Sequence, residues 1–191
     1  MTQTFSISSR ILHWTMAALI FAMLLIGIAM VSSLSGYHRL VAIHKPLGIL
    51  ILVLAALRLM NRCINPPPPL PEQMPFALRF AAHASHWLLY GLMCALPIVG
   101  WGMLSAAGYP IVLIGPLHLP SILPHSDGLY SALRSLHTGF AFALFAVLLA
   151  HIGAALTHAL IFRDGVFQSM ASWRRRPSVD STAGESAFRL T

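Results

Sequence analysis

The residues of this chain that could do chemistry are histidines set in long apolar stretches. Each of four such stretches carries a histidine near one of its ends, and the last carries three on a single helical stripe. Titratable side chains inside a bilayer are costly and therefore indicate function. Ten histidines among 191 residues, of which only 9% are charged, are typical of a protein that holds a cofactor in lipid. Neutral imidazoles that project from facing helices are ligands for haem.

The composition places these histidines in membrane-spanning helices. The chain is 57% hydrophobic and has a mean hydropathy of +0.75, which exceeds the range of soluble domains. A span needs about 20 apolar residues, and four stretches meet this need: 11–31, 40–60, 80–104 and 136–162. We therefore predict an all-α membrane protein, a four-transmembrane-helix bundle that forms one domain over residues 1–170, with a basic cytoplasmic tail at 171–191.

The positive charge of the chain is unevenly placed between the two sides of the predicted bundle. Three basic residues belong to one side, namely Arg39, Lys45 and Arg134, and nine to the other, namely Arg10, Arg58, Arg62, Arg79, Arg163, Arg174, Arg175, Arg176 and Arg189. Cytoplasmic segments carry the excess of Lys and Arg, so both termini and the middle connection are predicted to be cytoplasmic. The net charge of +7 is then a topology signal and does not indicate a nucleic-acid partner.

The fourth stretch presents histidines at two depths. His137 and His151 are 14 residues apart, which returns to within about 40° of the same helix face at an axial separation of about 21 Å. His158 follows seven residues later, about 10 Å deeper on nearly the same stripe. One helix therefore offers ligands at two levels, which is what two stacked haems require.

Each level needs an opposing histidine from another helix. His44 lies at the outer edge, at the depth of His137, whereas His13 lies at the inner end of the first stretch. His13 faces the region of His151 and His158, and depth alone fits His158 slightly better. The spacing leaves that choice open. No Cys-x-x-Cys-His motif is present, so the predicted haems are two non-covalent b haems.

The remaining histidines have other expected roles, and the positions of the acidic residues argue against a proton relay or a zinc transporter. His83 and His86 enter the third stretch on adjacent faces, where they suit headgroup contacts or a haem propionate. The outer-loop histidines, which are His38, His118 and His125, are expected to be solvated. A proton relay or a zinc transporter usually adds intramembrane carboxylates, yet all five acids lie outside the four stretches: Glu72, Asp127, Asp164, Asp180 and Glu185.

Prolines and glycines predict the irregular parts of the chain. Pro46 follows His44 by two residues, so the second helix either begins near Lys45 or kinks there. The segment 66–69 is four prolines and predicts a polyproline II connector. Pro97 predicts a kink in the third helix. The outer connection 106–131 is apolar but broken by Pro and Gly, so we expect it to cap the outer end of the bundle.

Several of these segments together resemble one family. Arg10-Ile-Leu-His13-Trp14, Ile43-His44, Ala82-His83-Ala-Ser-His86 with Tyr90, Ala95-Leu-Pro97-Ile-Val-Gly100, Leu136-His137, and His151 with His158 occur in order over residues 6–170. This ordered set is similar to that of the small bacterial cytochrome b561 proteins. Their wider group includes the membrane b-type subunits of nickel hydrogenases and formate dehydrogenases. Pro46 and the more apolar outer connection depart from the family pattern.

The resemblance implies a four-helix bundle in the bacterial inner membrane that encloses two bis-histidyl b haems. His13 and His151 would ligate the cytoplasmic-side haem, and His44 and His137 the outer one. The activity that it implies is superoxide:ubiquinone oxidoreduction, called superoxide oxidase. The alternative is an electron-relay subunit docked to a hydrogenase or dehydrogenase. The sequence leaves open whether the chain forms a homodimer or joins a redox partner subunit, and a transporter would bind no haem.

Two further groups of residues suit the implied activity. Superoxide is an anion, and a cationic rim of Arg39, Lys45 and Arg134 at the outer edge would concentrate it by electrostatic steering. His158, with Arg79 and His86 at similar depth, would bind quinone or a haem propionate at the inner side. There His158 would supply a proton for quinone reduction.

Overall fold

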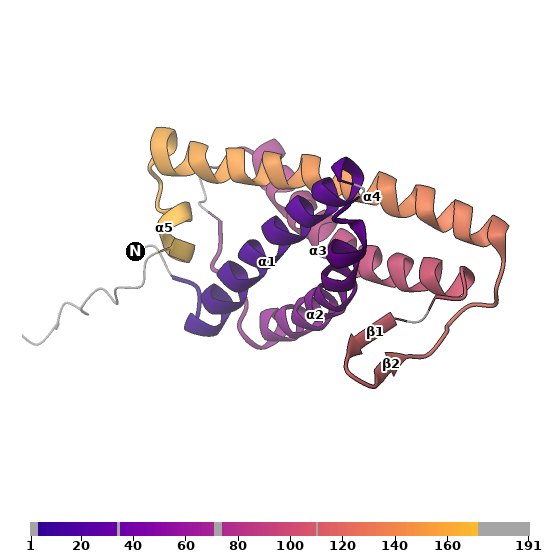
Figure 1. The fold of residues 1–191 in the computed structure, drawn as a ribbon. Helices are drawn as coiled ribbons and strands as arrows, with labels where there is room; N and C mark the ends of the chain where they lie inside the picture. Colours follow the sequence, from indigo (N-terminus) through magenta and orange to yellow (C-terminus); the bar gives the residue numbers. More distant parts are fainter. Residues whose placement is uncertain (1–3, 34, 71–73, 110, 172–191) are drawn as a thin grey trace, which may run out of the picture.

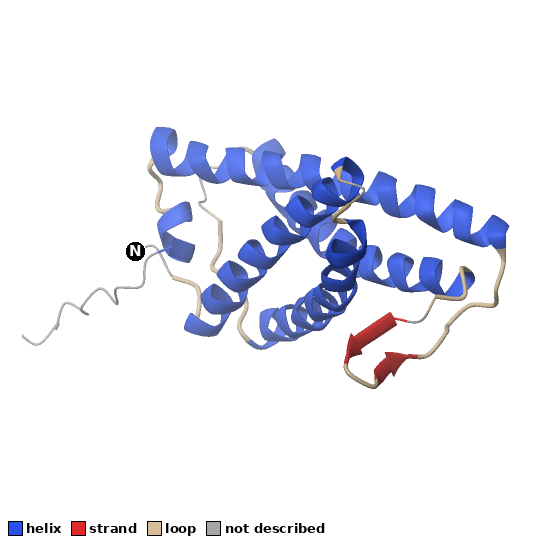
Figure 2. Ribbon diagram, viewed as in Figure 1, coloured by secondary structure: helices blue, strands red, loops and turns tan. Residues whose placement is uncertain are grey.

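The computed structural model describes residues 4–33, 35–70, 74–109 and 111–171, and these are mostly helical (Figures 1 and 2). The elements are α1 (Ile7–Ser32), α2 (Tyr37–Ile64), α3 (Phe76–Ala106), β1 (Ile111–Ile114), β2 (Leu117–Leu119), α4 (Asp127–Thr157), a π-helical turn η1 (His158–Phe162) and α5 (Val166–Ala171). Four helices, the last being α4 continued through η1, are long and apolar enough to span a membrane. The predicted fold class is confirmed. The tail at 172–191, with Arg174, Arg175, Arg176 and Arg189, and the acids Glu72, Asp180 and Glu185 lie outside the described residues.

The four long helices pack as two antiparallel pairs. α1 packs on α2 and α3 on α4, and α2 joins the pairs through α3. Their shared core lies at mid-depth and consists of Met16, Ile20, Ile51, Ala55, Tyr90, Leu92, Met93 and Leu144. Large apolar side chains such as Phe21 and Leu149 remain exposed, as lipid-facing residues do. The core therefore lies between the outer and inner histidines and separates the two levels.

All four long helices begin earlier than hydropathy predicts, α4 by the most. α4 starts at Asp127, nine residues before the apolar stretch, because Ser126 caps it by accepting a hydrogen bond from the Leu129 N–H at 3.3 Å. α2 starts at Tyr37 and continues through Pro46, so the alternative in which it begins near Lys45 is wrong. α3 likewise continues through Pro97. Polar first turns and a single proline are tolerated because local capping and neighbouring helices satisfy the backbone.

The outer connection contains a small hairpin that the sequence analysis did not predict. β1 and β2 pair antiparallel around a turn in which Gly115 has φ of 53°. The connection is tied to α3, because Trp101 Nε1 donates to the Pro120 carbonyl at 2.9 Å and the Ile122 N–H donates to Ser105 Oγ at 3.2 Å. Figure 1 shows the hairpin beside the end of α3, opposite the end that holds α5 and the N-terminus.

The short helix α5 returns to the beginning of α1. The Phe5 N–H donates to the Ser169 carbonyl at 3.2 Å, and Trp14 Nε1 donates to the Met170 carbonyl at 3.3 Å. The first and last described segments therefore share one end of the bundle, as an even number of spans requires.

Substitution of Leu144 tests how much the mid-depth core contributes to stability. Its side chain is 6% exposed, whereas Leu149 on the same helix is 54% exposed. Leu144→Ala should leave a cavity and cost about 2 kcal/mol of stability, while Leu149→Ala should cost less than about 0.5 kcal/mol. Thermal unfolding of the detergent-purified protein measures both. Equal loss from the two variants would contradict the described packing.

Candidate functional site

The outer site is a pair of facing histidines. His44 of α2 and His137 of α4 have ring centroids 6.3 Å apart and ring planes at 65°. A metal bound between two imidazoles lies about 2.0 Å from each nitrogen, and each nitrogen about 1.1 Å from its ring centre, which requires about 6.2 Å between centres. The observed separation therefore leaves room for one iron between the rings.

Helix α3 approaches the His137 ring from the side. Gly100 makes this approach possible, because a Cβ on it would lie 3.3 Å from His137 Cε1. The Nδ1 atoms of His44 and His137 are buried without a hydrogen-bond partner of good geometry among the described residues, although the Leu96 backbone lies close enough to the His137 ring to interact with it. Buried polar atoms without partners are rare, and they fit a site completed by a bound group.

The inner site is a second pair with the same separation. His13 of α1 and His151 of α4 have ring centroids 6.3 Å apart and ring planes at 67°. Arg58 of α2 lies behind His13, with Nη2 2.9 Å from His13 Nδ1. A guanidinium is a cation that only donates, so this contact sets a positive charge directly against the His13 ring.

A third imidazole lies close to the inner pair but does not have the spacing of a partner ligand. The His86 ring centroid is 5.4 Å from that of His151, too short for a metal between coaxial imidazoles at about 6.2 Å. His86 is half-buried and His83 is exposed. His86 therefore lies at the edge of the inner site.

The sequence left His151 and His158 open as the partner of His13, and the structure brings His151 beside it. His158 lies in the π-helical turn η1, and its Nδ1 is 2.6 Å from Asp164 Oδ2. Asp164 Oδ1 also accepts from the Val166 N–H at 3.1 Å. π-helical turns occur frequently at functional sites, and this one holds an imidazole–carboxylate pair at the inner end of α4.

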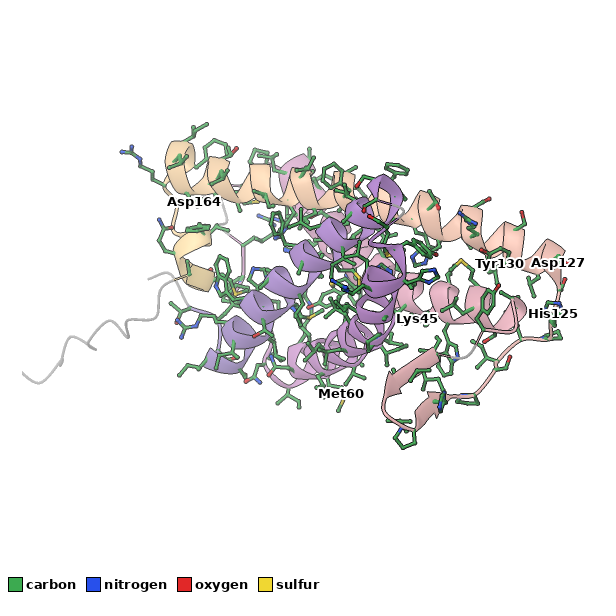
Figure 3. The ribbon with its side chains drawn as sticks, viewed as in Figure 1. Lys45, Met60, His125, Asp127, Tyr130 and Asp164 are labelled. Carbon is green, nitrogen blue, oxygen red and sulfur yellow. The ribbon has the colours of Figure 1, made fainter. Side chains whose placement is uncertain are left out.

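The three cations of the proposed rim lie on separate surfaces at the outer end. Arg39 and Lys45 are six residues apart on α2, about 120° apart around its axis. Arg39 is exposed and Lys45 half-buried. Arg134 of α4 is exposed and donates to Tyr130 Oη at 3.2 Å. Figure 3 shows Lys45 and Tyr130 toward the outer half of the bundle and Asp164 at the opposite end of α4.

Sequence reasoning missed two features of the inner site. Asp164 was assigned to the outside of the spans, and its pairing with His158 was not foreseen. Arg58 was counted only as a topology signal, although an arginine inside an apolar stretch is itself a functional signal. Arg79, predicted to assist at the inner side, lies half-buried in the first turns of α3.

Comparison with known proteins gives one family and several relatives. A family described as prokaryotic cytochrome b561 matches residues 4–173. The chain is 32% identical to "Cytochrome b561 homolog 2" of Escherichia coli over 172 residues, which cover 88% of this chain and 91% of that protein. It is also 32% identical to "Probable superoxide oxidase CybB" of Yersinia pestis over 138 residues, which cover 70% and 75%. "Cytochrome b561 homolog 1" of Escherichia coli is 30% identical over 146 residues, covering 74% and 80%.

The closeness of Gly100 to His137 yields a test of the outer site. Gly100→Val should push the His137 ring away and lower the haem content per protein. Gly91→Val is the matched control on α3, because nothing lies within 4 Å of a Cβ there. Both substitutions change helix propensity equally, so an equal loss of haem in the two variants would contradict the described contact.

Proposed function

Because the chain belongs to the prokaryotic cytochrome b561 family, we propose that it binds two b haems and oxidises superoxide at the outer side while reducing ubiquinone. The family makes it a multi-pass bacterial membrane cytochrome. The observation that carries the di-haem proposal is the repeated ring separation of 6.3 Å, at two levels of α4 that are 14 residues apart.

The chain's own residues would divide the work between the two levels. His44 and His137 would hold the outer haem, and His13 and His151 the inner one. When bound, the haems would supply one-electron transfer, and two histidines on each would leave no place for oxygen to bind. The apolar core around Leu144 keeps water and ions out of the space between the two levels.

At the outer end, the chain would gather the donor by charge. Arg39, Lys45 and Arg134 carry positive charge near the His44/His137 level, and the one exposed acid among the described residues, Asp127, lies ten residues before His137 at the start of α4. Positive potential at a mouth raises the encounter rate of an anion. Support for superoxide as this anion comes from the relative named as a probable superoxide oxidase.

At the inner end, the chain would supply protons. Two superoxide ions give up one electron each and leave as two O₂ molecules, while one ubiquinone gains those two electrons and two protons to form ubiquinol. His158, held by Asp164 at 2.6 Å, can donate a proton and be recharged from the cytoplasmic side. Arg79 and His86 would bind the quinone oxygens or a haem propionate.

The proposed ligand sets predict which variants lose haem. Pyridine haemochrome analysis of the purified protein should give two b haems per chain. His44→Ala or His137→Ala should remove one, and His13→Ala or His151→Ala should remove the other. His158→Ala should keep both, because its ring is engaged with Asp164. Haem loss in His158→Ala with retention in His151→Ala would overturn the pairing.

Rapid mixing tests the proposed reaction. A superoxide pulse should reduce the protein quickly, and the rate should fall as salt screens the rim. Replacing Arg39, Lys45 and Arg134 with Gln should slow reduction without changing the spectrum, while the exposed Arg163→Gln on the other side should not. A soluble ubiquinone analogue must then reoxidise the haems. Slow, salt-independent reduction, or no reoxidation, would favour the relay-subunit alternative.

A further inference from the structure

The two histidine pairs have the same ring separation but different electrical surroundings. Arg58 touches the inner pair, with its Nη2 2.9 Å from His13 Nδ1. The guanidinium carbon also lies 5.6 Å from the centre of the Tyr90 ring. Arg62 extends this positive charge, with its guanidinium carbon 5.9 Å from the rings of both Tyr90 and Trp87.

No carboxylate of the described part neutralises this charge. The two described acids are Asp127, at the outer start of α4, and Asp164, which is paired with His158. Figure 3 shows them at opposite ends of α4. An arginine keeps its proton in proteins, so Arg58 places a lasting positive charge beside the inner pair, half-buried within the bundle.

The outer pair has no equivalent. The Nδ1 of His44 has no hydrogen-bond partner among the described residues, and His137 faces Gly100 and the Leu96 backbone. Lys45 follows His44 in the chain but is turned about 100° from it around the α2 axis. The asymmetry between the two levels is therefore one of charge and not of ligand type.

We propose that Arg58 sets the direction of electron flow by making the inner haem the preferred place for the electron. This rests on the proposed di-haem function. One electron would pass from the haem held at the outer level to the haem held at the inner level, which oxidises the first and reduces the second, and no bond or proton would move. Reduction makes a haem one charge more negative, and a nearby cation in a low-dielectric site stabilises that state.

The matched pair Arg58→Gln and Arg58→Lys separates charge from mere positioning of His13. In redox titrations of the purified full chain, Arg58→Gln should shift the electron distribution between the haems at least tenfold toward the outer one, where tenfold corresponds to about 59 mV. Arg58→Lys keeps the charge and should shift it less than about threefold, or roughly 28 mV. Arg163→Gln, an exposed charge on the same side, is the control and should change it less than twofold.

If Arg58→Gln loses the inner haem, Arg62→Gln is used in its place. It removes a more distant charge and should shift the electron distribution between the haems in the same direction by a smaller factor. An unchanged distribution in Arg62→Gln would then overturn the proposal. So would wild-type haems of equal potential, or equal shifts in Arg58→Gln and Arg58→Lys. The titration uses neither superoxide nor quinone, so its result is independent of the proposed donor. A protein whose haems differ in potential as expected, but which superoxide does not reduce, would refute superoxide as the donor and still support the role of Arg58.

Discussion

The structure depends on one constraint, the placing of two pairs of imidazoles in a low-dielectric bundle, each pair with its ring centres 6.3 Å apart. α4 meets this constraint with a seven-residue repeat of His137, Leu144, His151 and His158. Seven residues of helix turn through about 700°, which is about 20° short of two full turns, so these side chains stay on one stripe. α2 and α1 supply the opposing rings at the two levels, with ring planes at 65° and 67° to those of the α4 histidines.

The long helices and the histidine levels could be predicted from sequence because lipid leaves few options. Backbone groups in hydrocarbon must be satisfied within a helix, so length and hydropathy suffice. The helix ends could not be predicted that way, because the polar first turns of α4 are fixed by Ser126 capping. The hairpin could not be predicted, because a short apolar run such as 111–114 fits a membrane-interface segment as well as a strand. The choice of His151 over His158 depends on η1 and on helix tilt, which depth arithmetic does not contain.

The inner end of the bundle holds more polar structure than the outer end. Ser9 Oγ accepts from Asn61 Nδ2 at 2.7 Å, joining α1 to α2, and Arg58 continues this contact toward His13. These are contacts between segments about 50 residues apart, which no local pattern reveals. They hold the inner pair rigidly, whereas the outer pair is held mainly by close backbone approach at Gly100. Loss of one glycine should therefore damage one level and spare the other.

The spacing of the two levels along α4 has an electrical consequence for the cell. Haems held at the two levels, which are about 21 Å apart along α4, would span roughly two-thirds of a hydrocarbon core of about 30 Å. In the proposed reaction, an electron carried inward would leave the outside more positive, and protons taken up from the inner side would add to the same separation of charge. At about 2.3 kcal/mol per charge per 100 mV for a full crossing, each inward electron would store about 1.5 kcal/mol per 100 mV. The proposed oxidation of superoxide would in this way also energise the membrane.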